Sequence, residues 1–297
     1  MPEAKVRGVI LNYRIVGERG ALIALTPGSR RGYDELVPIA ERFAAHGYRV
    51  LLHDRRNCGR SEVAIEAGGS EHEIWADDLD ALCEHLGENA VYAGGASAGA
   101  RLALLFALRH PERVKGLLLW RVTGGAHAAE KLAQQYYGDF IALAEKGGMD
   151  AVASSEHFAA CIKSRPSNRE RLIAMAPQTF IAIMNDWREN FLHAATLPVV
   201  GATEAQLRGL KIPVCLVAGN DKVHTPLAAR KAAALIPDSE LHDDVVSKRA
   251  ENDLLDEWDQ AEWKSKEDAL VALFTAFLAR IGAARAPQPG ASAVNAG

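Results

Sequence analysis

The sequence has few cysteines and no residue spacing typical of a metal site. Its four cysteines, Cys58, Cys83, Cys161 and Cys215, are far apart, and none belongs to a C-x-x-C pair or to a histidine-rich stretch. This distribution argues against a structural zinc site and against a disulfide framework. We expect neither a metal nor a cofactor.

Strong charge bias and long apolar runs are also absent. The 297 residues carry a formal net charge of −4 at pH 7, which gives no reason to expect nucleic acid as a partner. No apolar run approaches the roughly 20 residues that span a bilayer, and residues 1–5 lack the pattern of a secretory signal. We therefore expect a cytoplasmic monomer or homodimer that acts on a small molecule.

Short apolar segments typical of strands alternate with segments of helical periodicity. This alternation predicts an α/β fold with a mostly parallel central sheet covered by helices on both faces. Strands are predicted at 6–16 (as a hairpin), 22–26, 49–53, 90–94, 114–120, 213–218 and 239–246. Helices are predicted at 36–45, 71–86, 98–109 and 265–281, the last starting with a capping box formed by Ser265 and Asp268.

The alternation is interrupted once. From about residue 123 to 209 helical patterns recur without a clear strand, so we predict a helical cap there, inserted into a core of residues 1–122 and 210–282. Residues 283–297 are rich in Ala, Pro, Gly and Ser, and we predict a disordered tail.

The turn from Gly95 to Gly99 carries the clearest chemical signal. Its Gly-x-Ser-x-Gly pattern places Ser97 between a predicted strand and a predicted helix, as a nucleophile elbow requires. Such a turn is strained and crowded, and small residues on either side of the serine relieve the crowding. The alternative is a Gly-rich turn without catalysis; the surrounding order of elements favours the elbow.

Three further segments carry a resemblance to the α/β-hydrolase superfamily. The segment 26–29 (Thr-Pro-Gly-Ser) resembles its oxyanion loop, 54–61 (Asp-Arg-Arg-Asn-Cys-Gly-Arg-Ser) its D-x-R-G-x-G-x-S segment, and 219–226 its G-x-D-x-x-x-x-P acid loop. The resemblance covers nearly the whole chain. It implies that the backbone N–H groups of Ser29 and Ala98 bind the oxyanion and that Asp221 is the acid. Asn57 replaces a glycine of the family pattern, and asparagine is tolerated there if the position needs positive φ.

The general base departs from the family pattern. Members of the superfamily supply a histidine between the last strand and the last helix, but this chain has none between Val245 and Ser265. His224 in the acid loop is the first substitute, with a local surface histidine as the alternative. His242 serves only if its strand ends early, and His127 is a weaker candidate.

Several arginines follow the ends of predicted strands, where ligands bind in a doubly wound sheet. Arg30, Arg55 and Arg121 at these positions favour an anionic substrate, and Trp120 is a candidate pocket wall. Structural or solvated arginines, and a tryptophan packed in the core, explain the same residues.

Two functions remain open from the sequence. The first is a serine hydrolase of a small ester, lactone, amide or C–C bond, in which Ser97 attacks and Asp221 orients His224. The second is a non-hydrolytic protein of the same fold, either a cofactor-free lyase or decarboxylase-like enzyme or a small-molecule binding protein. The elbow and the acid loop favour the hydrolase.

Overall fold

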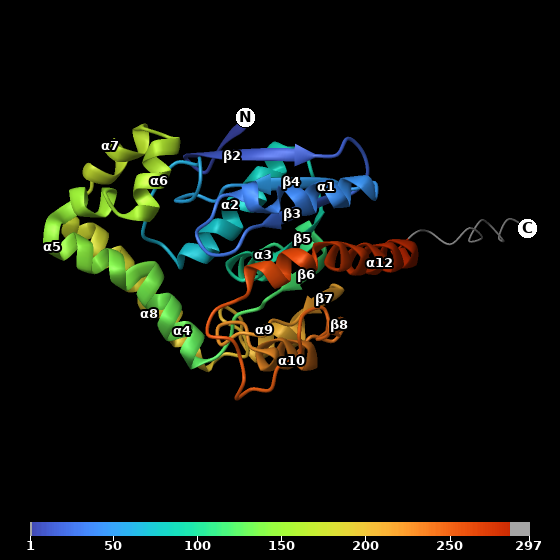
Figure 1. Ribbon diagram of the computed structural model, residues 1–297. Coiled ribbons are helices and arrows are strands. Elements are labelled where there is room, and N and C mark those ends of the chain that lie inside the picture. The colour runs from blue at the N-terminus through green and yellow to red at the C-terminus, as the bar shows by residue number, and fades with distance from the viewer. Residues whose placement is uncertain (1, 286–297) are drawn as a thin grey trace, which may run out of the picture.

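The computed structural model describes residues 2–285, which form a central sheet flanked by helices (Figure 1). The sheet has eight strands in the spatial order β1-β2-β4-β3-β5-β6-β7-β8. β2 runs antiparallel to β1 and β4, and the remaining neighbours are parallel. This confirms the predicted α/β fold. The strands are β1 (Glu3–Val6), β2 (Val9–Val16), β3 (Leu22–Thr26), β4 (Arg49–His53), β5 (Val91–Ala96), β6 (Val114–Trp120), β7 (Val214–Val217) and β8 (Ser239–His242).

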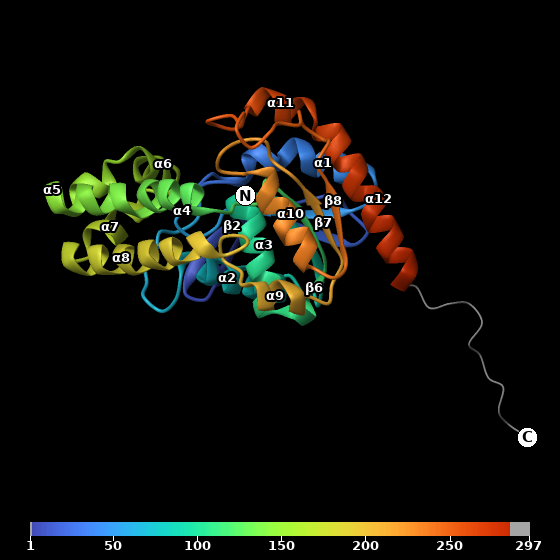
Figure 2. The same ribbon diagram turned by 90° about the horizontal axis from the view of Figure 1, so that it is seen from below.

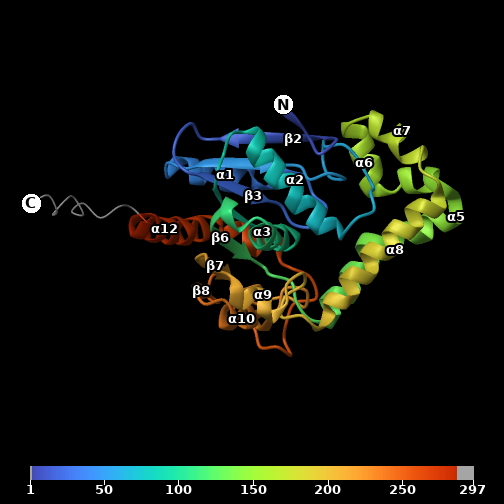
Figure 3. The same cartoon turned by 180° about the vertical axis from the view of Figure 1, so that it is seen from behind.

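The parallel strands are buried on both faces, as β3 shows. Leu22 and Ala24 belong to one hydrophobic cluster, while Ile23 and Leu25 belong to the other, because successive side chains of a strand point to opposite faces. Helices cover both clusters (Figures 2 and 3). One face packs α2 (Glu71–His85), α3 (Ala98–Arg109), α9 (Glu204–Gly209) and α10 (Pro226–Leu235); the other packs α1 (Val37–Ala45), α11 (Gln260–Ser265) and α12 (Glu267–Arg285).

A lobe of helices, here called the cap lobe, lies between β6 and β7 in the chain and stands off one end of the sheet (Figure 1). Its hydrophobic cluster includes Tyr137, Phe158 and Trp187 and continues into the core at Ile74 and Val223. The π-helical turn η3 (Gln134–Gly138) continues α4 and carries the two tyrosines of the lobe, Tyr136 and Tyr137, both of which are buried. α9, which also lies in the inserted range, buries Leu207 in the core instead. The lobe contains α4 (Ala126–Ala133), η3, α5 (Asp139–Ala153), α6 (Glu156–Ser164), α7 (Ser167–Ile173), α8 (Pro177–His193) and the short turn η4 (Ala194–Thr196).

The C-terminal helices differ from the prediction. Asp259 caps α11 by accepting hydrogen bonds from the N–H groups of Ala261 and Glu262. Ser265 closes that helix by donating to the carbonyl of Glu262, so the predicted capping box at Ser265 is wrong. α12 runs to Arg285, and residues 283–285 of the predicted tail are therefore helical. The rest of that tail, 286–297, lies outside the described residues.

The four cysteines are buried as free thiols in the described structure. Burial raises the pKa of Cys58 to about 11 and that of Cys83, Cys161 and Cys215 to about 12, so none is a ready thiolate nucleophile. Within residues 2–285, no helix combines the length and the apolar character needed to cross a bilayer.

Candidate active site

Ser97 lies on a strained turn between β5 and α3. Its backbone takes φ 54° and ψ −113°, and α3 begins at the next residue. Two flanking glycines are required by close packing on the end of β3. A Cβ on Gly95 would lie 2.4 Å from the carbonyl oxygen of Thr26, and one on Gly99 only 2.0 Å from the same atom. The geometry is therefore that of a nucleophile elbow, with the serine presented at the carboxyl end of the sheet.

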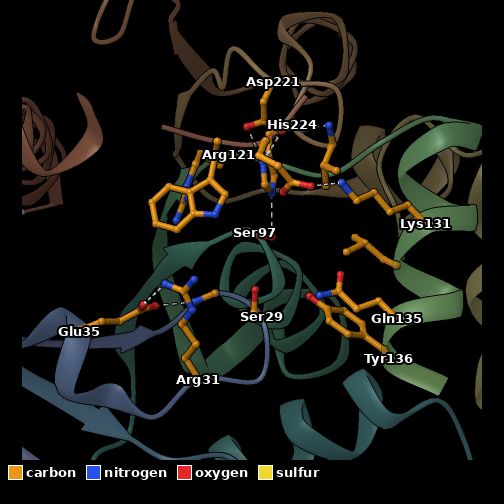
Figure 4. Close-up of a pocket in the computed structure, with 15 residues that line it drawn as sticks. Ser29, Arg31, Glu35, Ser97, Arg121, Lys131, Gln135, Tyr136, Asp221 and His224 are labelled. Carbon is orange, nitrogen blue, oxygen red and sulfur yellow. Dashed lines mark hydrogen bonds and ion pairs between the residues drawn. The ribbon is translucent and has the colours of Figure 1, made fainter. Parts of the chain in front are cut away.

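His224 faces Ser97 from the loop after β7. The Oγ of Ser97 lies 2.8 Å from Nε2 of His224, and Nδ1 of the same ring lies 2.8 Å from Oδ2 of Asp221 (Figure 4). A carboxylate only accepts, so Nδ1 carries a proton and donates to Asp221. Nε2 is then the acceptor for the Ser97 hydroxyl proton. Serine, imidazole and carboxylate are aligned as in an acyl-transfer triad.

The acid and the base share one short loop, and local contacts fix both. Asp221 also accepts hydrogen bonds from the N–H groups of Val223 and His224, at 2.9 and 3.0 Å. Thr225 caps α10 immediately afterwards. On the other side of the loop, a Cβ on Gly219 would lie 2.4 Å from the carbonyl oxygen of His224. The loop therefore has little freedom to move the imidazole.

The environment keeps His224 neutral and Asp221 ionised. Burial lowers the pKa of His224 below 6.5, and the positive charges of Arg121 and Arg101 lower it further, while Asp221 opposes the shift. Burial alone would raise the pKa of Asp221, but the hydrogen bonds and charge of His224 bring it below 3.8. A neutral imidazole at neutral pH is the form that accepts a proton.

The segment after β3 lies opposite Ser97, and the side chain of Arg55 holds it in place. Ser29 lines the pocket with a φ of 46°, and its N–H has no hydrogen-bond acceptor among the described residues. Arg55 supports this turn: its Nη2 donates to the Ser29 carbonyl at 2.8 Å, and its guanidinium stacks on Trp75 at 4.5 Å. The N–H of Ala98 lies in the first turn of α3, where backbone donors lack helical partners.

The D-x-R-G-x-G-x-S-like segment is structural. Asp54 accepts hydrogen bonds from the N–H groups of Tyr33 and Arg60 at 2.7 and 2.8 Å. Asn57 takes the predicted positive φ, 66°, and Arg56 pairs with Asp78 at 2.6 Å. This loop braces the segment that carries Ser29.

The pocket above Ser97 contains charged residues of both signs. Arg31 pairs with Glu35 at 2.9 Å, and Lys131 of α4 pairs with Glu257. Arg121 is different: among the described residues it has no carboxylate partner, and it stacks on Trp258 at 4.1 Å (Figure 4). It is 7% exposed and takes a φ of 54°. The full lining is Gly28, Ser29, Arg31, Glu35, Ser97, Arg121, Lys131, Leu132, Gln135, Tyr136, Asp221, Val223, His224, Glu257 and Trp258.

Two of the proposed substrate-binding arginines do not line this pocket. Arg30 is buried against Glu71 at 2.6 Å, so its charge is neutralised inside the protein. The Nη2 atom of Arg55 donates hydrogen bonds to backbone carbonyls of the segment after β3. The structure therefore does not bring Arg30 or Arg55 to the Ser97 pocket, because their groups serve internal partners.

Trp120 and two candidate histidines also lie elsewhere. Trp120 packs on Phe274 with ring centres 5.7 Å apart and lines a neighbouring cavity on the far side of Arg121. His242 remains on β8, with Nε2 3.7 Å from Glu240, and does not line the Ser97 pocket. His127 is exposed on α4. Of the three histidines considered as the base, the structure brings only His224 to Ser97.

Several lining residues were not found from the sequence. Lys131 and Gln135 come from the cap lobe, and Trp258 comes from the loop that usually carries the base. Helical periodicity groups residues on a face but does not say which face is turned to Ser97. The described residues hold no group of three or more metal-binding side chains.

Comparisons with known proteins agree with the fold described above. A sequence model of the family described as alpha/beta hydrolase fold matches residues 26–120. A proline iminopeptidase of Lacticaseibacillus rhamnosus (strain Lc 705) is 28% identical over 77% of this chain and 84% of its own length. The solved enol-lactonase of Burkholderia xenovorans LB400 superposes with a TM-score of 0.61 at 20% identity, covering 94% of this chain and all of the other.

The chain has the α/β-hydrolase fold. A meta-cleavage product hydrolase of Pseudomonas fluorescens IP01 shares the fold as well, with a TM-score of 0.62 at 18% identity, over 94% of this chain and 98% of the other. The family match and the proline iminopeptidase relative support the assignment of this protein as a hydrolase. The bond it cleaves is a separate question, because these relatives are named for different reactions.

Proposed function

We propose that this α/β-hydrolase is a serine hydrolase with Ser97 as nucleophile, His224 as general base and Asp221 as the acid that orients it. The observation that carries the proposal is the continuous chain of contacts, 2.8 Å from Ser97 Oγ to Nε2 of His224 and 2.8 Å from Nδ1 to Asp221. The histidine missing from the usual loop is thus replaced by one three residues after the acid.

The reaction follows from these contacts. Ser97 Oγ attacks the substrate carbonyl carbon while its proton passes to Nε2 of His224, and the N–H groups of Ser29 and Ala98 stabilise the oxyanion. The C–O or C–N bond of the substrate then breaks, and the leaving group takes the proton from His224. Water attacks the acyl-serine by the same proton transfers in reverse, which releases an acid and restores Ser97.

The charges of the pocket favour a substrate that carries a carboxylate. Glu35 and Glu257 are each paired with a cation, so neither is a free partner for a positively charged amine. Arg121 is the lining cation left without a carboxylate in the described structure. A guanidinium that is buried and unpaired gains most from an anionic ligand. We infer a small ester or lactone that bears a carboxylate.

A matched pair of substrates tests both parts of the proposal. The 4-nitrophenyl hemiester of succinate carries a carboxylate, and its methyl ester has the same chain without the charge. We expect the wild-type enzyme to prefer the hemiester by about 10–100-fold in kcat/KM, as for a hydrogen bond to a charged group. Arg121→Gln should lose that preference but still hydrolyse the neutral ester.

Ser97→Ala should hydrolyse neither ester and should not react with a fluorophosphonate. Wild-type rates in Ser97→Ala would overturn the serine mechanism. An unchanged preference in Arg121→Gln would overturn the substrate class and leave the mechanism standing.

A further inference from the structure

A second buried arginine, Arg101 of α3, also lacks an acidic partner among the described residues. It is 5% exposed, and its guanidinium stacks on the ring of Phe191 at 4.4 Å. Its Nη1 lies 3.0 Å from Nε2 of His72, but its Nε and Nη2 are buried without an acceptor. Two of its donor atoms are therefore free within the protein.

His72 does not supply the missing negative charge. Burial, together with the nearby charge of Arg101, lowers the pKa of His72 well below its ordinary 6.5, so the ring is neutral and accepts one hydrogen bond. Burial lowers the pKa of Arg101 to about 10, which leaves the guanidinium charged at neutral pH. A buried charge without a counter-charge is strongly unfavourable.

Two other arginines buried nearby pair with carboxylates, whereas Arg55 donates to backbone carbonyls. Arg56 pairs with Asp78, and Arg30 pairs with Glu71. Because these carboxylates are taken, the structure offers Arg101 no counter-charge of its own.

A small cavity adjoins Arg101 at the junction of α2, α3 and the C-terminal part of α8. α8 runs along the cap lobe and returns to the core at this end (Figure 3). The cavity measures about 50 Å³, whereas a single water needs about 10–15 Å³. Ser70, His72 and Asn190 add polar groups to its wall, and none of its lining residues lines the Ser97 pocket.

We propose that Arg101 binds a small monovalent anion from solution, of the size of chloride, bromide or formate, in this cavity. The single uncompensated charge and the small volume select a monovalent anion over phosphate or a larger carboxylate. An anion there would compensate the charge of Arg101 and would stabilise the contact of α8 with the core. The site is separate from Ser97 and does not depend on the proposed function.

Thermal unfolding at constant ionic strength tests the site, with sodium gluconate exchanged for sodium chloride because gluconate is too large to enter. Wild type should gain about 3–5 °C in Tm at a chloride concentration ten times the dissociation constant. Arg101→Met should not respond to chloride. In gluconate it should be at least as stable as wild type, because it removes an unpaired buried charge.

Arg109→Gln is the matched control, since Arg109 lies on the same helix, is exposed and pairs with Asp77. It should respond to chloride as wild type does. An equal response in all three proteins, or no response in wild type, would overturn the site.

A second measurement does not depend on any variant. Crystals of the wild-type enzyme soaked in sodium bromide should show an anomalous peak within about 3.5 Å of the Arg101 guanidinium, a contact distance for this larger ion. An empty cavity beside Arg101 in such crystals would overturn the proposal even if Arg101→Met did not fold.

Discussion

Replacing His224 by alanine is the most direct test of how this enzyme obtains its base. His224 is 5% exposed and is the only histidine lining the Ser97 pocket in the described structure, so no neighbouring imidazole can take its place. Loss of the base costs on the order of a millionfold in kcat in a well-studied serine protease, which corresponds to about 8 kcal/mol of activation free energy. We expect a loss of at least about 10⁴-fold, with the remainder supplied by the oxyanion site and substrate binding.

The assay combines initial rates of 4-nitrophenyl ester hydrolysis with the rate of labelling by a fluorophosphonate. His242→Ala is the control, because His242 lies on β8 beside Glu240 and away from the pocket; it should stay within about twofold of wild type, as a partly exposed substitution does. If His224→Ala keeps more than a tenth of wild-type activity, or if His242→Ala loses its activity, His224 is not the base.

Two further predictions concern the same loop. Because burial lowers the pKa of His224 below 6.5 and the neutral imidazole is the active form in the proposed mechanism, the fall of kcat/KM at acidic pH should have its midpoint below 6.5. Asp221→Asn, which removes a charge that raises this pKa, should move that midpoint to still lower pH. A midpoint above 6.5 in the pH profile would contradict the assignment. Gly219→Ala should lower kcat by about 100-fold or more, as a 1 Å misplacement can, because the new Cβ would meet the backbone of His224 at 2.4 Å. Gly209→Ala, which meets nothing within 4 Å, is the control, and equal kcat values for the two variants would contradict the steric reasoning.

The fold and the elbow were predictable because short-range patterns determine them. A buried strand followed by Gly-x-Ser-x-Gly and a helix leaves few structural solutions, and the strand at 114–120 was placed to the residue. His224 could be nominated for a similar reason. It lies three residues after Asp221, so any loop that turns the acid toward the pocket brings the imidazole along.

The roles of the arginines were not predictable, because their partners come from distant parts of the chain. Arg30 is neutralised by Glu71, 41 positions away, and Arg55 donates hydrogen bonds to carbonyls 24 to 27 positions away. A position just after a strand end predicts that the backbone of the residue lies near the pocket. It does not predict which partner the charged end of a long side chain will contact. Arg121 and Trp258 meet only because two loops converge.

The shared loop of Asp221 and His224 has a consequence for protein engineering. In this chain the proposed acid and base lie within the eight residues Gly219 to Pro226, and most of their mutual geometry is set by hydrogen bonds inside that segment. We therefore expect that this segment can be transferred as one piece between proteins of this fold. A recipient would keep proton transfer while its own histidine loop became free to be rebuilt for a new substrate.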